Sequence, residues 1–249
     1  MRSRASDRRL AAPPSISGRS SVARLPGPIA AASSSMAELI LLGGGGHARS
    51  VLAALRAEEV TVLGYLAPQE GDLGADCPYL GDDGVLATLD PDEVLFVNGL
   101  GSTSSTRARR DIYERAVARG FRAAQIVHPR GFVDPGAELH DGVQVLAGAF
   151  VNTGAVIGEN VLINSGAIVE HDAVVGAHVH VSPGAVVAGG VRIGHGAHIG
   201  LGARVIQGVS LGSGSVVGAG AVVIADVPTG AVVVGVPARA TGSERRESA

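Results

Sequence analysis

The sequence predicts two domains, a small parallel α/β domain followed by a parallel β-helix. Two observations predict this architecture. Residues 38–127 contain two strand–helix–strand segments, each with a glycine-rich loop after its first strand. Residues 131–226 then divide into sixteen consecutive six-residue units without an insertion. A repeat of six residues is too short for a helical repeat and is typical of parallel β-helices.

The first 35 residues differ in composition from the rest of the chain. They contain six Arg, nine Ser and one acidic residue, and they have no apolar periodicity. Such a composition cannot form a packed core. It fits either an organelle transit peptide, which is rich in Arg and Ser, or a disordered leader or mis-assigned start, with translation beginning at Met36. We favour the second interpretation, and we expect residues 241–249 to form a disordered tail.

The expected α/β domain spans residues 36–128 and has the connectivity of a Rossmann-like fold. Its first segment predicts a strand at Glu38–Leu42, an amphipathic helix at Ala48–Glu58 and a strand at Thr61–Leu66. Segments of this length connect parallel strands through a crossover helix. The second segment predicts a strand, a helix and a strand at Val94–Asn98, Thr106–Ala118 and Arg122–Val127.

The loop after the first strand has the spacing Gly43-x-Gly45-x-x-Ala48. Glycines at this spacing let an anionic ligand approach the N-terminus of the following helix. The second strand ends at Ala67 and Pro68 and lacks the acidic residue that contacts the ribose of NAD. The loop therefore indicates a cradle for a phosphate or carboxylate without a redox cofactor, or else a purely structural tight turn.

Three arginines, Arg107, Arg109 and Arg110, open the second predicted helix. Positive charges at a helix N-terminus oppose the helix dipole. Either an anion lies nearby or these side chains are solvated.

The β-helix domain is expected to span residues 129–240. The third residue of every unit is aliphatic, from Val133 to Val223, and the first is small or Val. Each unit predicts one short strand with its third residue inside, followed by a corner where Gly or Asn accepts the turning backbone. Three units form a coil of eighteen residues, so residues eighteen apart stack and the aliphatic side chains form a continuous core.

Composition and charge exclude several classes of protein. The formal net charge is -3, which gives no reason to expect nucleic acid as a partner. The sequence contains no run of eighteen apolar residues, so we expect no membrane span. The single cysteine, Cys77, excludes an internal disulfide and a cysteine-based metal cluster. Such cysteine usage fits a reducing compartment, and we expect a cytoplasmic protein.

Six histidines lie in the β-helix: His140, His171, His178, His180, His195 and His198. A metal site is one interpretation, although His180 and His198 are the only pair spaced by one coil. A zinc site completed by a neighbouring chain, as in γ-class carbonic anhydrases, stays open. For His140, His178 and His195 we expect ordinary surface positions.

His171 differs because Glu170 and Asp172 flank it at a corner. An imidazole beside a carboxylate gains basicity and a fixed orientation, which a general base needs. The alternative is an ordinary polar corner.

Four motifs together resemble one family, the PglD/NeuD-like sugar acyltransferases. They are Leu42–Ala48 (LGGGGHA), Asn164–Asp172 (NSGAIVEHD), His178–Gly184 (HVHVSPG) and Gly235–Arg239 (GVPAR). The resemblance covers about four fifths of the chain. It implies a left-handed β-helix, a homotrimer, and acetyl-CoA as cosubstrate without a metal.

The resemblance also implies a set of site residues. His171 would be the general base and Asp172 the acid that raises its basicity. The acetyl group and CoA would contact His180, Leu201 and Ala219. Because the β-helix has more acidic than basic residues, we expect CoA binding to depend also on local donors such as Arg204 and Arg239. The sugar nucleotide would contact Gly45, Gly46, His47, Gly101 and Asn164.

The predicted function is an acetyl-CoA-dependent N-acetyltransferase acting on a nucleotide-linked amino sugar for surface glycan synthesis. Two alternatives stay open, an O-acetyltransferase of the sialic-acid type and a γ-carbonic-anhydrase-like zinc lyase. His171 lies at a corner opposite the sheet that carries His180, about 10–15 Å away across the prism. If both act on one acetyl group, neighbouring chains must supply them.

Overall fold

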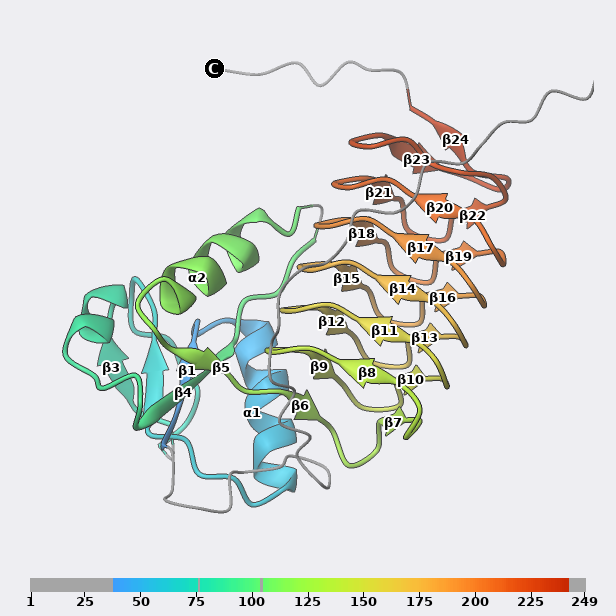
Figure 1. The fold of residues 1–249 in the computed structure, drawn as a ribbon. Helices are drawn as coiled ribbons and strands as arrows, with labels where there is room; N and C mark the ends of the chain where they lie inside the picture. Colours follow the sequence, from blue (N-terminus) through green and yellow to red (C-terminus); the bar gives the residue numbers. More distant parts are fainter. Residues whose placement is uncertain (1–37, 76, 104, 242–249) are drawn as a thin grey trace, which may run out of the picture.

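The computed structural model describes residues 38–75, 77–103 and 105–241 (Figure 1). The predicted leader and the tail beyond residue 241 lie outside the described residues. Figure 1 shows the two parts of the fold side by side, with α1 and α2 in one part and a stack of short strands in the other. The fold is an α/β domain followed by a left-handed parallel β-helix, as predicted.

The α/β domain contains a five-stranded parallel sheet with the order β3-β2-β1-β4-β5. Alternate residues of β1 face two separate cores: Leu39 and Leu41 pack with α1, and Ile40 and Leu42 pack with α2. The two helices therefore cover opposite faces of the sheet. The elements are β1 (Glu38–Leu42), α1 (Gly46–Ala57), β2 (Gly64–Leu66), β3 (Tyr79–Gly81), a short 3-10 helix (Asp83–Ala87), β4 (Val94–Asn98), α2 (Arg107–Val117) and β5 (Arg122–Ala123).

The strand order reverses between β1 and β4, which pair along their full length. In open α/β sheets the ligand-binding crevice forms at such a switch point, beyond the carboxyl ends of the strands. The loops that follow β1 and β4 are the two glycine-rich loops of the sequence. The fold therefore brings both loops to the switch point, where a ligand-binding crevice is expected.

The prediction of one continuous strand at residues 122–127 is wrong. Residues Arg122–Val127 form two strands that belong to different sheets: β5 pairs with β4, whereas β6 (Ile126–Val127) pairs with β9 of the β-helix. Between them, the Gln125 amide nitrogen donates to the backbone carbonyls of Leu139 and His140 at 2.9 and 3.1 Å. The chain thus enters the β-helix already at β6.

Each of the sixteen six-residue units contributes one two-residue strand, from β7 to β22, at its second and third residues. The strands form three parallel sheets, the faces of a triangular prism. Sheet I contains β7 (Phe132–Val133), β10 (Phe150–Val151), β13 (Ile168–Val169), β16 (Val186–Val187), β19 (Arg204–Val205) and β22 (Val222–Val223). Sheet II contains β8 (Glu138–Leu139), β11 (Val156–Ile157), β14 (Val174–Val175), β17 (Arg192–Ile193) and β20 (Ser210–Leu211). Sheet III contains β6, β9 (Gln144–Val145), β12 (Leu162–Ile163), β15 (His180–Val181), β18 (His198–Ile199), β21 (Val216–Val217), β23 (Val232–Val234) and β24 (Arg239–Ala240).

The predicted coil of eighteen residues is confirmed by the strand register. Phe150 pairs with Ile168 and His180 pairs with His198, each eighteen residues apart. From Val145 to Val223, the third residues of the units are at most 3% exposed and form one core. The sixth residue of most units has a positive φ, which explains the Gly at that position.

The last coil ends differently from the others. β23 continues sheet III in parallel, but β24 then turns back and pairs with β23 in antiparallel fashion. Val233 lies opposite Ala240, and Val234 lies opposite Arg239. The final strand of the described chain therefore covers the end of sheet III.

The α/β domain packs against sheet III of the β-helix. Several side-chain contacts cross this junction, among them those from His47 to Gln144, from Ser102 to His180, and from Thr106 to the Gly196 carbonyl. Sheets I and II face away from it (Figure 1). Among the described residues, no helix has the length and apolar character to cross a membrane.

Candidate active site

His171 and Asp172 lie at the corner between sheets I and II, after β13. The His171 Nδ1 atom donates to the Asp172 carboxylate at 2.9 Å, and the two side chains are 58% and 74% exposed. This hydrogen bond raises the pKa of His171 above its usual value. Because Nδ1 carries the proton, the lone pair is on Nε2. The corner thus presents an oriented basic nitrogen.

A second carboxylate supports this corner. Glu170, the residue before His171, accepts a hydrogen bond from the Asn152 amide at 2.7 Å, one coil earlier. The negative charge of Glu170 adds to the rise in the His171 pKa. Asp172 itself has φ of 58°, a left-handed conformation that Asp and Asn tolerate better than most residues.

The loop after β1 forms the first wall of the crevice. A Cβ atom at Gly45 would meet no other atom within 4 Å, so open space lies above this residue. Helix α1 begins at Gly46 without a side-chain cap, which leaves its first backbone N–H groups available to a ligand. This geometry suits an anion at a helix N-terminus.

The loop after β4 forms the second wall. A Cβ atom at Gly101 would lie 3.1 Å from the Cβ of His47, and one at Gly99 would lie 3.1 Å from that of Ala48. A side chain at either glycine would therefore require the two loops to shift apart by a few tenths of an ångström. His47 Nε2 donates to Gln144 at 3.0 Å, and burial lowers the pKa of His47 to about 4. His47 is neutral at pH 7 and holds the first loop against the β-helix.

His180 is buried where the second loop meets sheet III, with 3% of its surface exposed. The Asn164 amide donates to Nε2 at 3.0 Å, and Nδ1 is then the donor to the Ser102 hydroxyl at 2.5 Å. Burial lowers the pKa of His180 to about 3, so the imidazole is neutral. The structure thus brings Asn164 and His180 together and occupies both ring nitrogens with protein partners.

Leu201 and Ala219 lie at another corner, between sheets III and I. They are eighteen residues apart, and the Gly220 amide donates to the Leu201 carbonyl at 2.8 Å between adjacent coils. Leu201 is 58% exposed. These two residues form an exposed column in two successive coils of this corner.

Arg109 is fully buried, so the expectation that it is solvated is wrong. Its side chain is 1% exposed, and its Nη1 atom donates to the carbonyls of Asn98 and Leu100 at 3.0 and 2.7 Å. Burial lowers the pKa of this guanidinium to about 9, which leaves it charged at pH 7. Arg109 supports the second loop from inside the domain.

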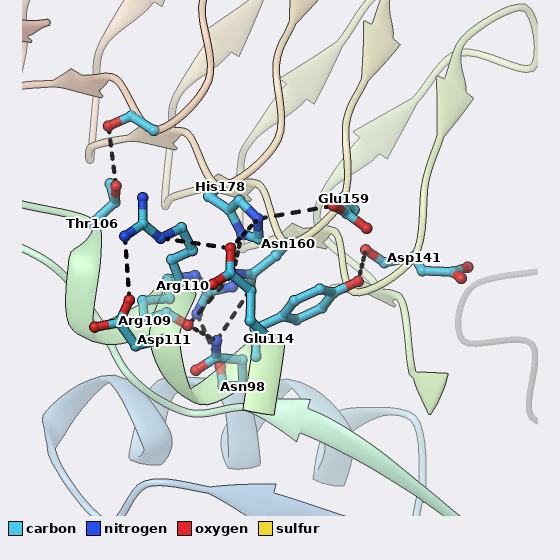
Figure 2. A network of polar contacts seen from close by, with 12 residues as sticks. Asn98, Thr106, Arg109, Arg110, Asp111, Glu114, Asp141, Glu159, Asn160 and His178 are labelled. Carbon is cyan, nitrogen blue, oxygen red and sulfur yellow. Dashed lines mark hydrogen bonds and ion pairs between the residues drawn. The ribbon is translucent and has the colours of Figure 1, made fainter. Parts of the chain in front are cut away.

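His178 is also buried, with 3% exposure, and the expected surface position is wrong (Figure 2). Asn160 donates to its Nδ1 atom at 2.8 Å, and the Asn98 amide donates to Asn160 at 3.1 Å. Figure 2 shows these side chains between α2 and the β-helix. They are structural groups of the domain junction, as is Gln144. Sequence spacing gave no sign of them, since their partners are distant in the chain.

His140 and His195 fit their predicted surface positions. His195 is exposed, and His140 is partly exposed and lies 3.1 Å from Glu138. Within the described part of the chain, no three metal-binding side chains come together in a way that could hold an ion.

This chain is similar to known proteins in both sequence and fold. Residues 38–116 match the PglD N-terminal domain, and residues 154–189 match the bacterial transferase hexapeptide (six repeats). The structure is similar to PerB from Caulobacter crescentus, solved in complex with CoA and GDP-perosamine, with 37% identity and a TM-score of 0.77. The match covers 85% of this chain and 100% of PerB. This chain belongs to the PglD/NeuD-like sugar acetyltransferases.

Two further structures show the same likeness. The acetyltransferase domain of PglB from Neisseria gonorrhoeae, in complex with acetyl coenzyme A, is 35% identical with a TM-score of 0.77; the match covers 82% of this chain and 99% of that domain. WeeI from Acinetobacter baumannii shares the fold at 23% identity, with a TM-score of 0.74 over 82% and 99% of the two chains. No protein of curated function matches the sequence at a significant level.

Membership of the PglD/NeuD-like sugar acetyltransferases fixes the class of chemistry. The protein is an acyltransferase that uses acetyl-CoA and acts on a sugar substrate.

Proposed function

We propose that this enzyme N-acetylates an amino sugar carried on a nucleotide, with His171 as the general base, in the synthesis of a surface glycan. A 37% identical relative is described as a GDP-perosamine N-acetyltransferase and was solved with CoA and that sugar nucleotide. The single observation that carries the proposal is the hydrogen bond from His171 Nδ1 to Asp172 at an exposed corner. Both substrates are metabolites of the cytoplasm, where we place the enzyme.

The proposed reaction is a direct transfer. The amine nitrogen attacks the thioester carbonyl of acetyl-CoA while Nε2 of His171 takes one amine proton. Backbone N–H groups stabilise the oxyanion until the carbon–sulfur bond breaks and the CoA thiolate leaves. The only cysteine, Cys77, is buried in the α/β domain, so the enzyme offers no thiol for an acyl-enzyme intermediate.

Substrate binding is proposed at the two walls of the crevice and at the exposed column. Gly45, Gly46, His47, Gly101 and Asn164 would contact the sugar nucleotide. Leu201 and Ala219 would line the path of CoA. His180 would act beside them by fixing Ser102 and Asn164 through its two hydrogen bonds.

The active site is proposed to lie between chains. His171 lies at one edge of sheet I, and the column of Leu201 and Ala219 lies at its other edge. The loops after β1 and β4 of the same chain contact sheet III, whereas His171 lies at the corner between sheets I and II. A rotated copy that packs along sheet I brings the His171 corner of one chain to the column and loops of the next. A closed ring of three chains then has three identical sites.

The outer face of sheet I supports this assembly. The second residue of each unit points outward, and on sheet I these residues are apolar in all but one strand: Phe132, Phe150, Ile168, Val186 and Val222. The rings of Phe132 and Phe150 stack with their centres 4.8 Å apart, and Phe132 is 47% exposed. An apolar face of this kind is typical of a surface that is covered in an oligomer.

The test is acetyl-CoA consumption, followed as thiol release, with UDP-, dTDP- and GDP-linked amino sugars and free sialic acid as acceptors. We expect turnover of one nucleotide-linked amino sugar and a fall of at least about 100-fold in kcat for His171→Ala, because a general base contributes this much. His140→Ala, which changes a histidine away from the corner, is the matched control. Turnover of sialic acid alone would contradict N-acetylation, and an active His171→Ala would contradict the assignment of the base.

A further inference from the structure

The imidazole of His171 rests on a glycine of the next coil. Thr153, His171, Gly189 and Gln207 occupy equivalent places in four successive coils at the corner between sheets I and II. The amide of Gly190 donates to the His171 carbonyl at 2.9 Å and joins the two coils. Gly189 is therefore the residue directly above His171.

Gly189 has no room for a side chain while His171 keeps its position. A Cβ atom at Gly189 would lie 2.6 Å from Nε2, 2.7 Å from Cε1 and 3.2 Å from Cδ2 of the ring. These three ring atoms are the nearest to it, so the imidazole is the first obstacle. Gly189 is not among the residues with a positive φ, and its backbone accepts an L-residue without strain.

Asp172 rests on a glycine on the opposite side. A Cβ atom at Gly154, one coil earlier, would lie 2.7 Å from the Asp172 carboxylate. The hydrogen-bonded pair of His171 and Asp172 is thus enclosed between two glycines of the adjoining coils. The ring contacts the following coil and the carboxylate contacts the preceding one.

We propose that Gly189 is a positioning residue for acetyl transfer. Its bare Cα lets the His171 ring lie against the corner, with Nδ1 toward Asp172 and Nε2 beside Gly189. This inference rests on the proposed role of His171 as the base. Beyond the two flanking acids, the base also needs a glycine eighteen residues later in the chain.

The substitution Gly189→Ala should remove most of the activity but leave the fold intact. The added methyl group forces the ring to rotate away, because no heavy atoms approach to 2.6 Å without a shift. His171 is exposed, so its side chain turns into solvent and the aliphatic core is undisturbed. Nε2 then leaves the position from which it reaches the amine, and the bond to Asp172 breaks.

The experiment combines kinetics with a direct probe of the ring. We expect kcat to fall about 10- to 100-fold in Gly189→Ala, as misplacement of a catalytic group by about 1 Å does elsewhere. KM for both substrates and the unfolding temperature should stay near those of the wild type. Gln207→Ala, one coil further in the same column, is the matched control and should keep wild-type kcat.

Histidine NMR reports the ring without reference to turnover. In the wild type the His171 pKa lies above its usual value because of Asp172. In Gly189→Ala it should return toward the ordinary value, with the signal assigned from its absence in His171→Ala. On the His171→Ala background, a further Gly189→Ala should have no effect, since the ring it displaces is gone.

The outcomes separate this inference from the proposed function. An unchanged His171 titration in Gly189→Ala would overturn the positioning role whatever the activity. A changed titration with unchanged kcat would also overturn it, because the ring's position would then not matter for catalysis. If the wild type transfers no acetyl group to any acceptor, the proposed function fails, while the titration still decides whether Gly189 sets the position of the ring.

Discussion

His171 and His180 lie nine residues apart and have opposite surroundings. His171 is exposed and has a raised pKa, and its Nδ1 donates to Asp172. His180 is buried, has a pKa of about 3, and has protein partners at both nitrogens. A proton acceptor must reach the substrate and exchange its proton with water afterwards. These environments support the proposed role of His171 as the base and favour a holding role for His180.

Replacing Asp172 by Asn should weaken the base without unfolding the corner. Asn tolerates the left-handed backbone at this position and removes only the charge. The His171 pKa should fall, so the base stays unprotonated to lower pH and the acid limb of the kcat/KM profile moves to lower pH. The maximum rate should drop on the order of 10-fold, because a weaker base accepts the amine proton less well. An unshifted acid limb would show that Asp172 does not set the basicity of His171.

His180 should make stability depend on pH. Its pKa is about 3 in the folded protein and near 6.5 when unfolded, so between these values the unfolded chain binds more protons. The free energy of unfolding should therefore fall as the pH falls from 6.5 toward 3, by about 1.4 kcal/mol per pH unit from this residue. Thermal or urea unfolding between pH 7 and 4 measures the slope. His180→Asn should reduce it, and an equal slope in both proteins would contradict the buried neutral state.

Sequence information predicted the hydrogen-bonded pair of His171 and Asp172 and missed the junction, for a physical reason. His171 stands between two acids in the chain, so its electrostatic neighbours could be predicted from adjacent letters. The partner of His180 is Ser102, seventy-eight residues away, and that of His47 is Gln144, ninety-seven residues away. Such pairs depend on how one domain packs on another. The burial of His178 has the same origin.

At the scale of single elements, the aliphatic third residues stabilise the β-helix. Ile157 of β11 is fully buried, and its neighbour Val156 points outward on the same strand. Ile157→Ala should lower the free energy of unfolding by about 2–5 kcal/mol, because it leaves a cavity between stacked coils. Val156→Ala is the matched control and should cost less than about 1 kcal/mol. Denaturant unfolding compares the two, and equal losses would contradict the assignment of inside and outside positions.

The strands of the β-helix were predictable to the residue, whereas the entry to it was not. A strict period of six fixes which residues point inward, and β7 to β22 follow it without exception. The segment 122–127 shows only two short apolar stretches, and either sheet could accept them. Pairing of β6 with β9 depends on the docking of the whole α/β domain. Local pattern carries no information about that choice.

At the scale of the whole molecule, the proposed site needs two chains, and mixed oligomers can test this directly. His171→Ala removes the base, and Gly45→Asp adds a carboxylate in open space at the crevice, where it should repel an anionic substrate. Each variant alone should be inactive. When the two variants are co-expressed, some sites combine His171 from a Gly45→Asp chain with the unchanged Gly45 loop of a His171→Ala chain. Those sites are intact. About a quarter of clefts should be intact in random mixtures.

The control for this experiment mixes the two purified variants without allowing subunits to exchange. Activity should then stay absent. If co-expression also restores nothing, while size measurements show mixed oligomers, the base and the crevice of one chain must serve the same site. That result would contradict the intersubunit arrangement and leave the sugar acetyltransferase class unaffected.

The reversed strand β24 limits end-to-end association between copies of this protein. In a parallel β-helix, the backbone N–H and C=O groups of each coil form hydrogen bonds with the next coil. In an open last coil these groups are unpaired and can bind the backbone of another chain. Copies joined in this way would extend end to end as a fibre. By turning back along β23, the chain closes this edge of sheet III with its own backbone. Growth along the axis is blocked there, so contacts between copies are directed to the sides of the prism, where an assembly can close.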